Sequence, residues 1–165
     1  MENDARARHQ SGPWNLQMGQ EIDGFILGER LHMGGMATIW AVRRKDDPDG
    51  PPLIMKVPRI KGGEDPATIV GFEVEQMVMP MLSGPHVPAF VAKGYFTRLP
   101  YIVMEQIPGP SLKASFDRAP LPFDEVADAG ARVAQALHAL HKQHVVHLDI
   151  KPSNILFRQI GRAHV

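Results

Sequence analysis

The sequence predicts an α+β fold in two lobes, a strand-rich part followed by a helical part. Short runs of β-branched, aliphatic and aromatic residues, separated by turn residues, fill the stretch from Phe25 to Ile107. After Ile107 the apolar residues recur at helical spacing. Strands first and helices afterwards are typical of α+β proteins, and the Pro-Gly-Pro at residues 108–110 marks the joint between the two parts.

Composition excludes several classes of protein. With 44% hydrophobic and 22% charged residues, the 165-residue chain has the composition of a soluble globular protein. Its 18 basic and 18 acidic residues cancel, so composition gives no attraction for nucleic acid or anionic membrane. The absence of cysteine excludes disulfides and thiolate chemistry. Neither a signal peptide nor a membrane span is visible, so we expect a cytoplasmic protein.

Five strands are predicted after a polar, aperiodic segment, residues 1–20, that we expect to be a flexible extension. Mostly tight connections between the strands favour a small antiparallel sheet. The strands are FILGERL (25–31), ATIWAV (37–42), PLIMKVP (52–58), AFVAKGYF (89–96) and PYIVMEQI (100–107).

One helix interrupts the strands, between the third and the fourth. Asp65 can cap it, Pro66 suits its first turn and Gly84 can close it. Pro80 lacks the amide that a helix needs at that position, so it predicts a kink or an early end. The apolar face that the spacing predicts consists of Val70, Val74, Met77, Val78 and Met81.

The second part is predicted to contain a short helix near SLKASF (111–116) and a long one over residues 123–143. The long helix is amphipathic, as expected for a helix that packs on one side. Its predicted apolar face is formed by Val126, Gly130, Val133, Ala134, Leu137 and Leu140.

Two features of the strand-rich part have chemical potential. Gly34 and Gly35 stand between two strands, where the absence of side chains lets backbone amides approach a phosphate. A glycine pair alone is more typical of an ordinary turn. Lys56 lies in an apolar strand and needs either an anion or a path for its ammonium group to solvent. Glu75, in the helix that follows, is a candidate partner.

The segment HVVHLDIKPSN (144–154) carries the most specific pattern. Asp149, Lys151 and Asn154 supply a proton acceptor, a cation and a metal-binding amide oxygen within six residues. Phosphoryl transfer needs mainly positioning and charge stabilisation, which these three groups can provide.

From Phe25 to about Phe157 the sequence resembles the protein kinase family, most closely the bacterial serine/threonine kinases. The resemblance implies a protein kinase-like fold, with a five-stranded antiparallel N-lobe at 21–107 and part of a helical C-lobe at 108–159. It also implies ATP and Mg²⁺ as cofactors and a protein with Ser or Thr hydroxyls as substrate. No nucleic acid or membrane partner is expected for this stretch of chain.

The resemblance assigns roles residue by residue. It makes Lys56 the ligand of the α and β phosphates, with Glu75 as its ion-pair partner. Asp149 accepts or orients the substrate proton, Lys151 steadies the transferring phosphoryl group, and Asn154 binds magnesium. The nucleotide-binding residues implied are Gly34 and Gly35 at the phosphates, Ile39, Ile54 and Leu156 around adenine, Met104 as gatekeeper, and the backbone of Glu105 and Ile107.

The sequence also departs from the family pattern. His32 and Ala37 replace two loop glycines, which predicts a stiffer glycine loop. Ile54 replaces the usual alanine, and Leu148 replaces an arginine that would pair with an activation-loop phosphate. No Asp-Phe-Gly follows Asn154, so the principal metal-binding aspartate is missing and we expect the chain as written to be an inactive fragment.

The last residues, IGRAHV (160–165), match no family pattern. Back-translated, they reproduce part of a widely used sequencing adapter, so we expect the genuine coding sequence to end near Arg158 or Gln159.

Two other functions stay open. Small-molecule phosphotransferases of the aminoglycoside and choline type share the fold, and Lys151 is the residue that favours a protein kinase over them. A pseudokinase or nucleotide-binding module is the second alternative. The four histidines at 138, 141, 144 and 147 do not predict a metal site, because the helix ends before they could share one face.

Overall fold

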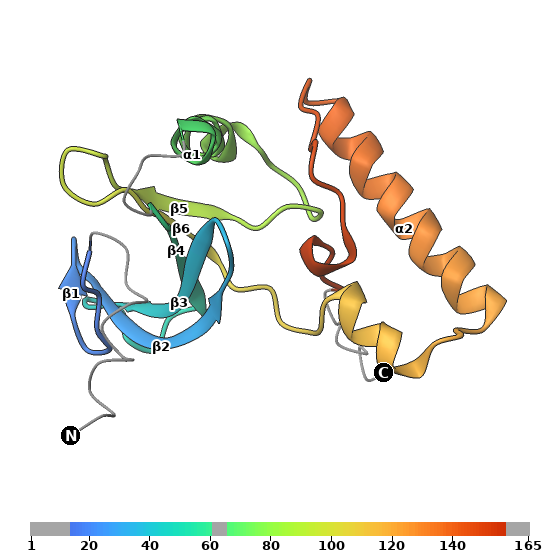
Figure 1. Cartoon of the computed structure of the whole chain (residues 1–165), viewed down its shortest axis with the longest axis horizontal. Coiled ribbons are helices and arrows are strands. Elements are labelled where there is room, and N and C mark those ends of the chain that lie inside the picture. The colour runs from blue at the N-terminus through green and yellow to red at the C-terminus, as the bar shows by residue number, and fades with distance from the viewer. Residues whose placement is uncertain (1–13, 61–65, 158–165) are drawn as a thin grey trace. The chain divides into compact units, whose positions relative to one another are not determined.

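A computed structural model of the chain describes residues 14–60 and 66–157 (Figure 1). The chain divides into two compact units. The first comprises residues 1–81 and 89–106, and the second comprises residues 82–88 and 107–165. Among the described residues, no helix is both long enough and apolar enough to cross a membrane.

The first unit is built on a six-stranded antiparallel sheet with the order β1-β2-β3-β4-β6-β5. All five predicted strands are present, and a two-residue strand, β1, joins the edge of the sheet, which the sequence did not predict. The strands are β1 (Glu21–Ile22), β2 (Phe25–Met33), β3 (Ala37–Arg44), β4 (Leu53–Pro58), β5 (Phe90–Lys93) and β6 (Ile102–Glu105).

Strand β4 shows how the sequence sorts residues between the two faces of the sheet. Side chains alternate along a strand, so Leu53, Met55 and Val57 enter the main core together. Ile54 and Lys56 therefore point to the opposite face. The buried members of the main core are Ile22, Phe25, Leu27, Trp40, Val42, Leu53, Met55, Val57, Tyr101 and Val103.

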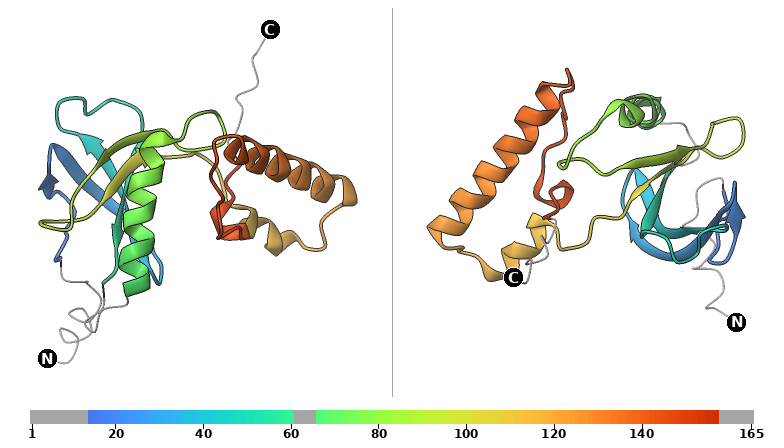
Figure 2. Two further views of the ribbon diagram at one scale, coloured as in Figure 1. Left: turned by 90° about the horizontal axis from the view of Figure 1, so that it is seen from above. Right: turned by 180° about the vertical axis from the view of Figure 1, so that it is seen from behind.

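The opposite face of the sheet is covered by helix α1 (Pro66–Val78), which Figure 2 shows from two sides. Phe72 of the helix forms a second buried cluster with Ile102 and Met104 of β6. The helix ends at Val78 and continues as a 3-10 turn, η2 (Met79–Met81). Pro80 thus ends the α-helix early, as the sequence predicted. Asp65, the expected cap, lies outside the described residues.

The apolar face predicted for α1 is wrong at four of its five positions, and only Val78 is partly buried. Val70, Val74, Met77 and Met81 are between 51% and 75% exposed, whereas Phe72 and Gln76 are the buried residues of the helix. Spacing identified an apolar stripe but could not show which side of the helix meets the sheet. The buried side carries Gln76, a polar residue that a search for apolar periodicity passes over.

Residues 14–20 pack on the sheet, although their polar sequence predicted a flexible extension up to residue 20. Trp14 and Leu16 lie against the main core, and the Trp14 indole N–H donates to the Arg98 carbonyl oxygen at 3.0 Å. The Gly19 amide donates to the Leu27 carbonyl at 2.7 Å, which adds to the edge of β2. The sequence signal that was missed is the pair of large apolar residues within this polar segment.

Up to residue 157, where the described residues end, the second unit contains three helices: η3 (Leu112–Arg118), α2 (Phe123–His141) and η4 (Pro152–Asn154). The predicted short helix is a 3-10 helix, and the long one begins at Phe123 as expected. Within α2 only Leu140 is buried, and Val126 of the predicted apolar face is 52% exposed. Gln143 ties the end of this helix to Ser83 through two hydrogen bonds, 2.9 Å and 3.1 Å long.

Candidate active site

Lys56 and Glu75 form an ion pair between β4 and α1. The Lys56 Nζ lies 2.6 Å from Glu75 Oε2 and 2.7 Å from Oε1, so one ammonium group donates to both carboxylate oxygens. The two side chains are 27% and 31% exposed. Charge-assisted hydrogen bonds of this kind are stronger than neutral ones, and partial burial shields them from solvent. The lysine therefore has an anionic partner and does not simply extend into solvent.

The register of the sheet gathers three predicted nucleotide-binding residues around Lys56. Ile39 lies directly opposite Lys56 on β3, and Ile54 lies directly opposite Met104 on β6. Directly opposed residues of antiparallel strands point to the same side of the sheet, as do residues two apart in one strand. These four side chains therefore share the sheet face that α1 covers. Together they form an apolar patch with one fixed ammonium group.

The glycine loop between β2 and β3 is held by a residue that the sequence analysis missed. The Arg59 guanidinium donates to the Gly34 carbonyl oxygen at 2.7 Å, and the Arg59 amide donates to the Met36 carbonyl at 2.8 Å. A Cβ on Gly34 would lie 3.2 Å from the His32 imidazole, whereas one on Gly35 would meet nothing within 4 Å. The loop is thus crowded at Gly34 and open at Gly35.

The remaining predicted nucleotide-binding residues, Glu105, Ile107 and Leu156, are divided between the two units. The Glu105 amide donates to the Ala89 carbonyl at 2.9 Å, which completes the pairing of β6 with the chain before β5. Ile107 and Leu156 belong to the second unit. Leu156 is 46% exposed and forms an isolated β-bridge with Ser111.

The second unit brings Asp149, Lys151 and Asn154 together. Lys151 Nζ lies 2.8 Å from Asp149 Oδ2, and Asn154 Nδ2 donates to the same oxygen at 2.9 Å and to the Asp149 carbonyl at 3.0 Å. Leu148, just before them, has a φ of 61°, in the left-handed region that costs energy for a branched residue. This turn starts the short segment in which the three polar side chains converge.

The pKa of Asp149 lies below its ordinary value. The hydrogen bond from Lys151 is the largest cause, and the hydrogen bond from Asn154 adds to it, while desolvation opposes both. The carboxyl group therefore stays ionised at neutral pH and can accept a proton or a hydrogen bond from a hydroxyl group.

Oxygen ligands for a magnesium ion are available in this cluster. Because the Asn154 nitrogen faces Asp149, the amide oxygen is the atom it can offer to a cation, and Mg²⁺ prefers such oxygen ligands. Within residues 14–60 and 66–157, no group of three or more His, Cys, Asp or Glu side chains is arranged to hold a metal. Asn154 alone would supply one ligand of an incomplete set.

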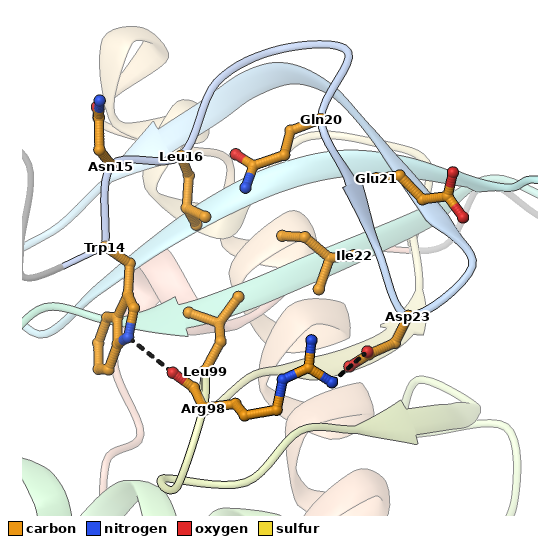
Figure 3. Close-up of a pocket in the computed structure, with 9 residues that line it drawn as sticks. All are labelled: Trp14, Asn15, Leu16, Gln20, Glu21, Ile22, Asp23, Arg98 and Leu99. Carbon is orange, nitrogen blue, oxygen red and sulfur yellow. Dashed lines mark hydrogen bonds and ion pairs between the residues drawn. The ribbon is translucent and has the colours of Figure 1, made fainter.

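One pocket of about 420 Å³ lies elsewhere, against residues 14–23 and the β5–β6 turn (Figure 3). None of the predicted site residues lines it. Two interactions cross it: the Trp14 indole N–H donates to the Arg98 carbonyl, and the Arg98 guanidinium lies 3.5 Å from Asp23. This pocket is therefore separate from the patch around Lys56.

Comparison with known proteins identifies the family. Residues 39–165 match the family model for the protein kinase domain. The chain belongs to the protein kinase family. It is 30% identical to a probable serine/threonine-protein kinase, PknB, of Lactococcus lactis over 91% of this chain, and 31% identical to the serine/threonine-protein kinase AfsK of Streptomyces griseus over 82%. This chain spans only 24% of the length of the first relative and 16% of the length of the second.

Solved structures agree on the fold. The kinase domain of Mycobacterium tuberculosis PknI superposes with a TM-score of 0.71 at 26% identity, covering 86% of this chain and 57% of that domain. The predicted protein kinase-like fold and the bacterial serine/threonine kinase resemblance are confirmed. The roles assigned to individual residues, and the cytoplasmic location, stay predictions.

Proposed function

We propose that the protein to which this chain belongs is a serine/threonine protein kinase that transfers the γ-phosphoryl group of ATP to a hydroxyl group of a protein substrate. The observation that carries the proposal is the Lys56–Glu75 pair, set on the same sheet face as Ile39, Ile54 and Met104. A fixed ammonium beside an apolar patch suits the phosphates and the base of a nucleotide.

In the proposed mechanism, each unit contributes one part of the chemistry. Lys56 holds the α and β phosphates, and Glu75 keeps its ammonium group in place. The apolar side chains of Ile39, Ile54 and Met104 would exclude water from the adenine site, to which the backbone of Glu105 would also contribute. Backbone amides at Gly34 and Gly35 approach the phosphates, with Gly35 the more open position.

The Asp149 cluster would act on the substrate hydroxyl group. Asp149, ionised because of its lowered pKa, orients the hydroxyl group and accepts its proton. Lys151 would steady the transferring phosphoryl group, and Asn154 would hold a magnesium ion. Magnesium, when bound, neutralises charge on the phosphates. A small-molecule phosphotransferase is the second candidate, but Lys151, paired with Asp149 at 2.8 Å, favours a protein substrate.

Nucleotide binding by the 165-residue chain is the first test. We would measure its melting temperature with and without a saturating non-hydrolysable ATP analogue and Mg²⁺, and expect a rise of about 5 °C. Lys56→Met should abolish the rise. Lys45→Met is the matched control, because Lys45 also pairs with a glutamate at 2.7 Å but on the exposed surface. If the wild-type chain gains no stability from the analogue, the nucleotide site is refuted.

Phosphoryl transfer would be tested in the full-length parent protein with radiolabelled ATP and casein. Asp149→Asn should reduce transfer by about 10²- to 10⁴-fold while leaving the nucleotide-dependent stabilisation unchanged. A parent protein that binds nucleotide but transfers no phosphoryl group would instead support the pseudokinase alternative. Transfer to aminoglycoside or choline but not to casein would support the small-molecule alternative.

A further inference from the structure

Gln76 is the only buried polar residue within the described parts of the chain, with 6% of its surface exposed. It lies in α1 directly after Glu75. A buried amide group is costly unless it is hydrogen-bonded, so its partners indicate what it does.

The partners of Gln76 all belong to the β5–β6 hairpin. The side-chain Nε2 donates to the Gly94 carbonyl at 2.7 Å and to the Tyr101 carbonyl at 3.0 Å. In the other direction, Lys93 Nζ donates to the Gln76 backbone carbonyl at 3.2 Å. Three hydrogen bonds thus connect a single helical residue to one hairpin, two of them through both hydrogens of one amide group.

The hairpin is itself fixed at this point. The Gly94 amide donates to the Tyr101 carbonyl at 2.9 Å, so the two carbonyls that Gln76 contacts belong to one paired position. A side chain on Gly94 would collide with the Leu99 carbonyl and the Tyr101 ring, which leaves the backbone no room for a larger residue. Gln76 therefore binds to a hydrogen-bonded and closely packed part of the hairpin.

Phe72 also packs α1 on the sheet. Phe72, one turn before Gln76, is 5% exposed and packs edge-on against Phe96 with ring centroids 6.2 Å apart. Val74 and Met77, the residues before and after the Glu75–Gln76 pair, are 51% and 67% exposed. Phe72 and Gln76 are the two buried residues of the helix; they are four residues apart and face the same side.

We propose that Gln76 is a positioning residue: its hydrogen bonds to the β5–β6 hairpin hold α1 where Glu75 meets Lys56, without help from a bound nucleotide. Adjacent helical residues point about 100° apart, so Gln76 can face the hairpin while Glu75 faces β4. The hydrogen bonds to the hairpin fix the rotation of α1 about its own axis and its position on the sheet. They therefore also fix the position of the Glu75 carboxylate. The consequence for nucleotide affinity rests on the proposed function.

The absence of cysteine makes a direct test simple. Cysteines introduced at Val70 of α1 and Arg43 of β3, both exposed, would carry spin labels, and pulsed electron paramagnetic resonance would give the distance distribution between them. We expect one narrow distribution in the wild-type background, unchanged by the ATP analogue. A broad or two-peaked wild-type distribution that becomes narrow only with the analogue would overturn the proposal.

Two variants separate positioning from simple packing. Gln76→Leu keeps the size but removes both donors, and should broaden the distribution. In Gln76→Glu, the distance distribution between the labels should be broad at neutral pH and become narrow in acid. The reason is that a protonated carboxyl group can donate one hydrogen bond to the hairpin carbonyls. The wild-type protein at the same pH values corrects for other titrating groups. Rescue by acid is a result that a merely space-filling role would not give.

Met77→Ala is the control, since this neighbour of Gln76 is exposed, and it should behave as wild type. A wild-type distribution in Gln76→Leu, or no acid rescue in Gln76→Glu, would overturn the proposal. If Gln76→Leu fails to fold, the acid response of Gln76→Glu still decides.

Failure of the proposed function would look different. In that case the melting temperature of the wild-type chain would not respond to the ATP analogue, while the distance distributions of the variants would still change. If both proposals are correct, Gln76→Leu should weaken binding of the ATP analogue by about tenfold. In Gln76→Glu, acid should restore part of the affinity for the analogue.

Discussion

The phenol of Tyr101 donates a 2.9 Å hydrogen bond to Asp23 Oδ2, joining residues that are 78 positions apart in the sequence. Tyr101 is 3% exposed and lies just before β6, whereas Asp23 occupies the turn between β1 and β2 with a φ of 47°. This bond fixes a turn in a conformation that is uncommon for non-glycine residues. The edge strand β1 therefore depends on a tyrosine from the far part of the sheet.

Tyr101→Phe should lower the free energy of unfolding by about 1 kcal/mol, because it removes one hydrogen bond without changing the packing of the ring. Urea denaturation followed by circular dichroism would measure the change. Tyr95→Phe is the control, since Tyr95 is 66% exposed. Equal stability of the Tyr101 variant and the wild type would show that the bond contributes nothing net.

Stability should fall at alkaline pH, and Tyr101 should account for part of the fall. Burial first, and then the hydrogen bond to Asp23, raise the pKa of Tyr101 above its ordinary value. The folded state therefore keeps its proton when the unfolded state has lost it. This contribution to stability is complete below the unfolded pKa of about 10 and is lost as the pH rises towards the folded value. Melting temperatures between about pH 9 and 12 should decline less steeply in Tyr101→Phe than in the wild type.

Breaking the pair between β4 and α1 should destabilise the chain. Glu75→Gln leaves the partly buried Lys56 ammonium without its carboxylate, which we expect to cost about 1 to 3 kcal/mol. Glu73→Gln, on the exposed side of the same helix, should change stability by less than about 0.5 kcal/mol. Equilibrium unfolding of both variants would measure the difference. An equal effect of the two substitutions would contradict a specific role for the pair.

The ionisation of Asp149 should depend on Lys151. Removing the ammonium group in Lys151→Met removes the largest cause of the lowered pKa, so the pKa of Asp149 should move up towards its ordinary value. Carbon-13 NMR of the labelled carboxyl group would follow the titration, with Lys142→Met as the control.

The lowered pKa of Asp149 links its ionisation to stability at acid pH, whereas the raised pKa of Tyr101 does so at alkaline pH. A depressed folded pKa stabilises the protein above the unfolded pKa, and this contribution is lost as the pH falls through the folded value. Because the Asp149 side chain is 60% exposed, solvent screens the interaction and the effect on stability should be small. An unchanged NMR titration in Lys151→Met would contradict the proposed cause.

The glycine loop should become more mobile without the Arg59 side chain. Arg59→Ala removes the donor to the Gly34 carbonyl but keeps the backbone bond to Met36. Amide hydrogen exchange in residues 33–37 should accelerate by about tenfold, as expected for the loss of about 1.4 kcal/mol of local stability. Arg43→Ala, on the exposed part of β3, is the control and should leave this exchange unchanged.

Prediction from sequence succeeded where the signal is local. The five strands were visible because alternating apolar residues and turn residues are properties of neighbouring positions. The early end of α1 followed from Pro80, whose missing amide acts on its own turn. The triad Asp149, Lys151 and Asn154 could be seen because all three lie within six residues.

Prediction failed where a residue's environment comes from a distant part of the chain. The buried face of α1 was placed on the wrong side, since its polar member, Gln76, is stabilised by carbonyls 18 and 25 residues away. Arg59 went unnoticed because its partner, Gly34, lies 25 residues earlier. Residues 14–20 were expected to be flexible, and nothing in their own composition shows that Trp14 reaches the carbonyl of Arg98.

The sequence by itself determined in which succession strands and helices follow one another along the chain. It also determined the position of Lys56 within a buried strand and the spacing of Asp149, Lys151 and Asn154. These are properties of neighbouring residues, whose periodicity and turn chemistry can be seen without knowing which distant parts of the chain meet. Only the tertiary structure decided which face of α1 is buried, that Glu75 closes on Lys56, and that Arg59 and Gln76 hold the parts around them. Those outcomes require burial and hydrogen bonding between segments far apart in the chain, and both arise only when the sheet and the helix have packed together.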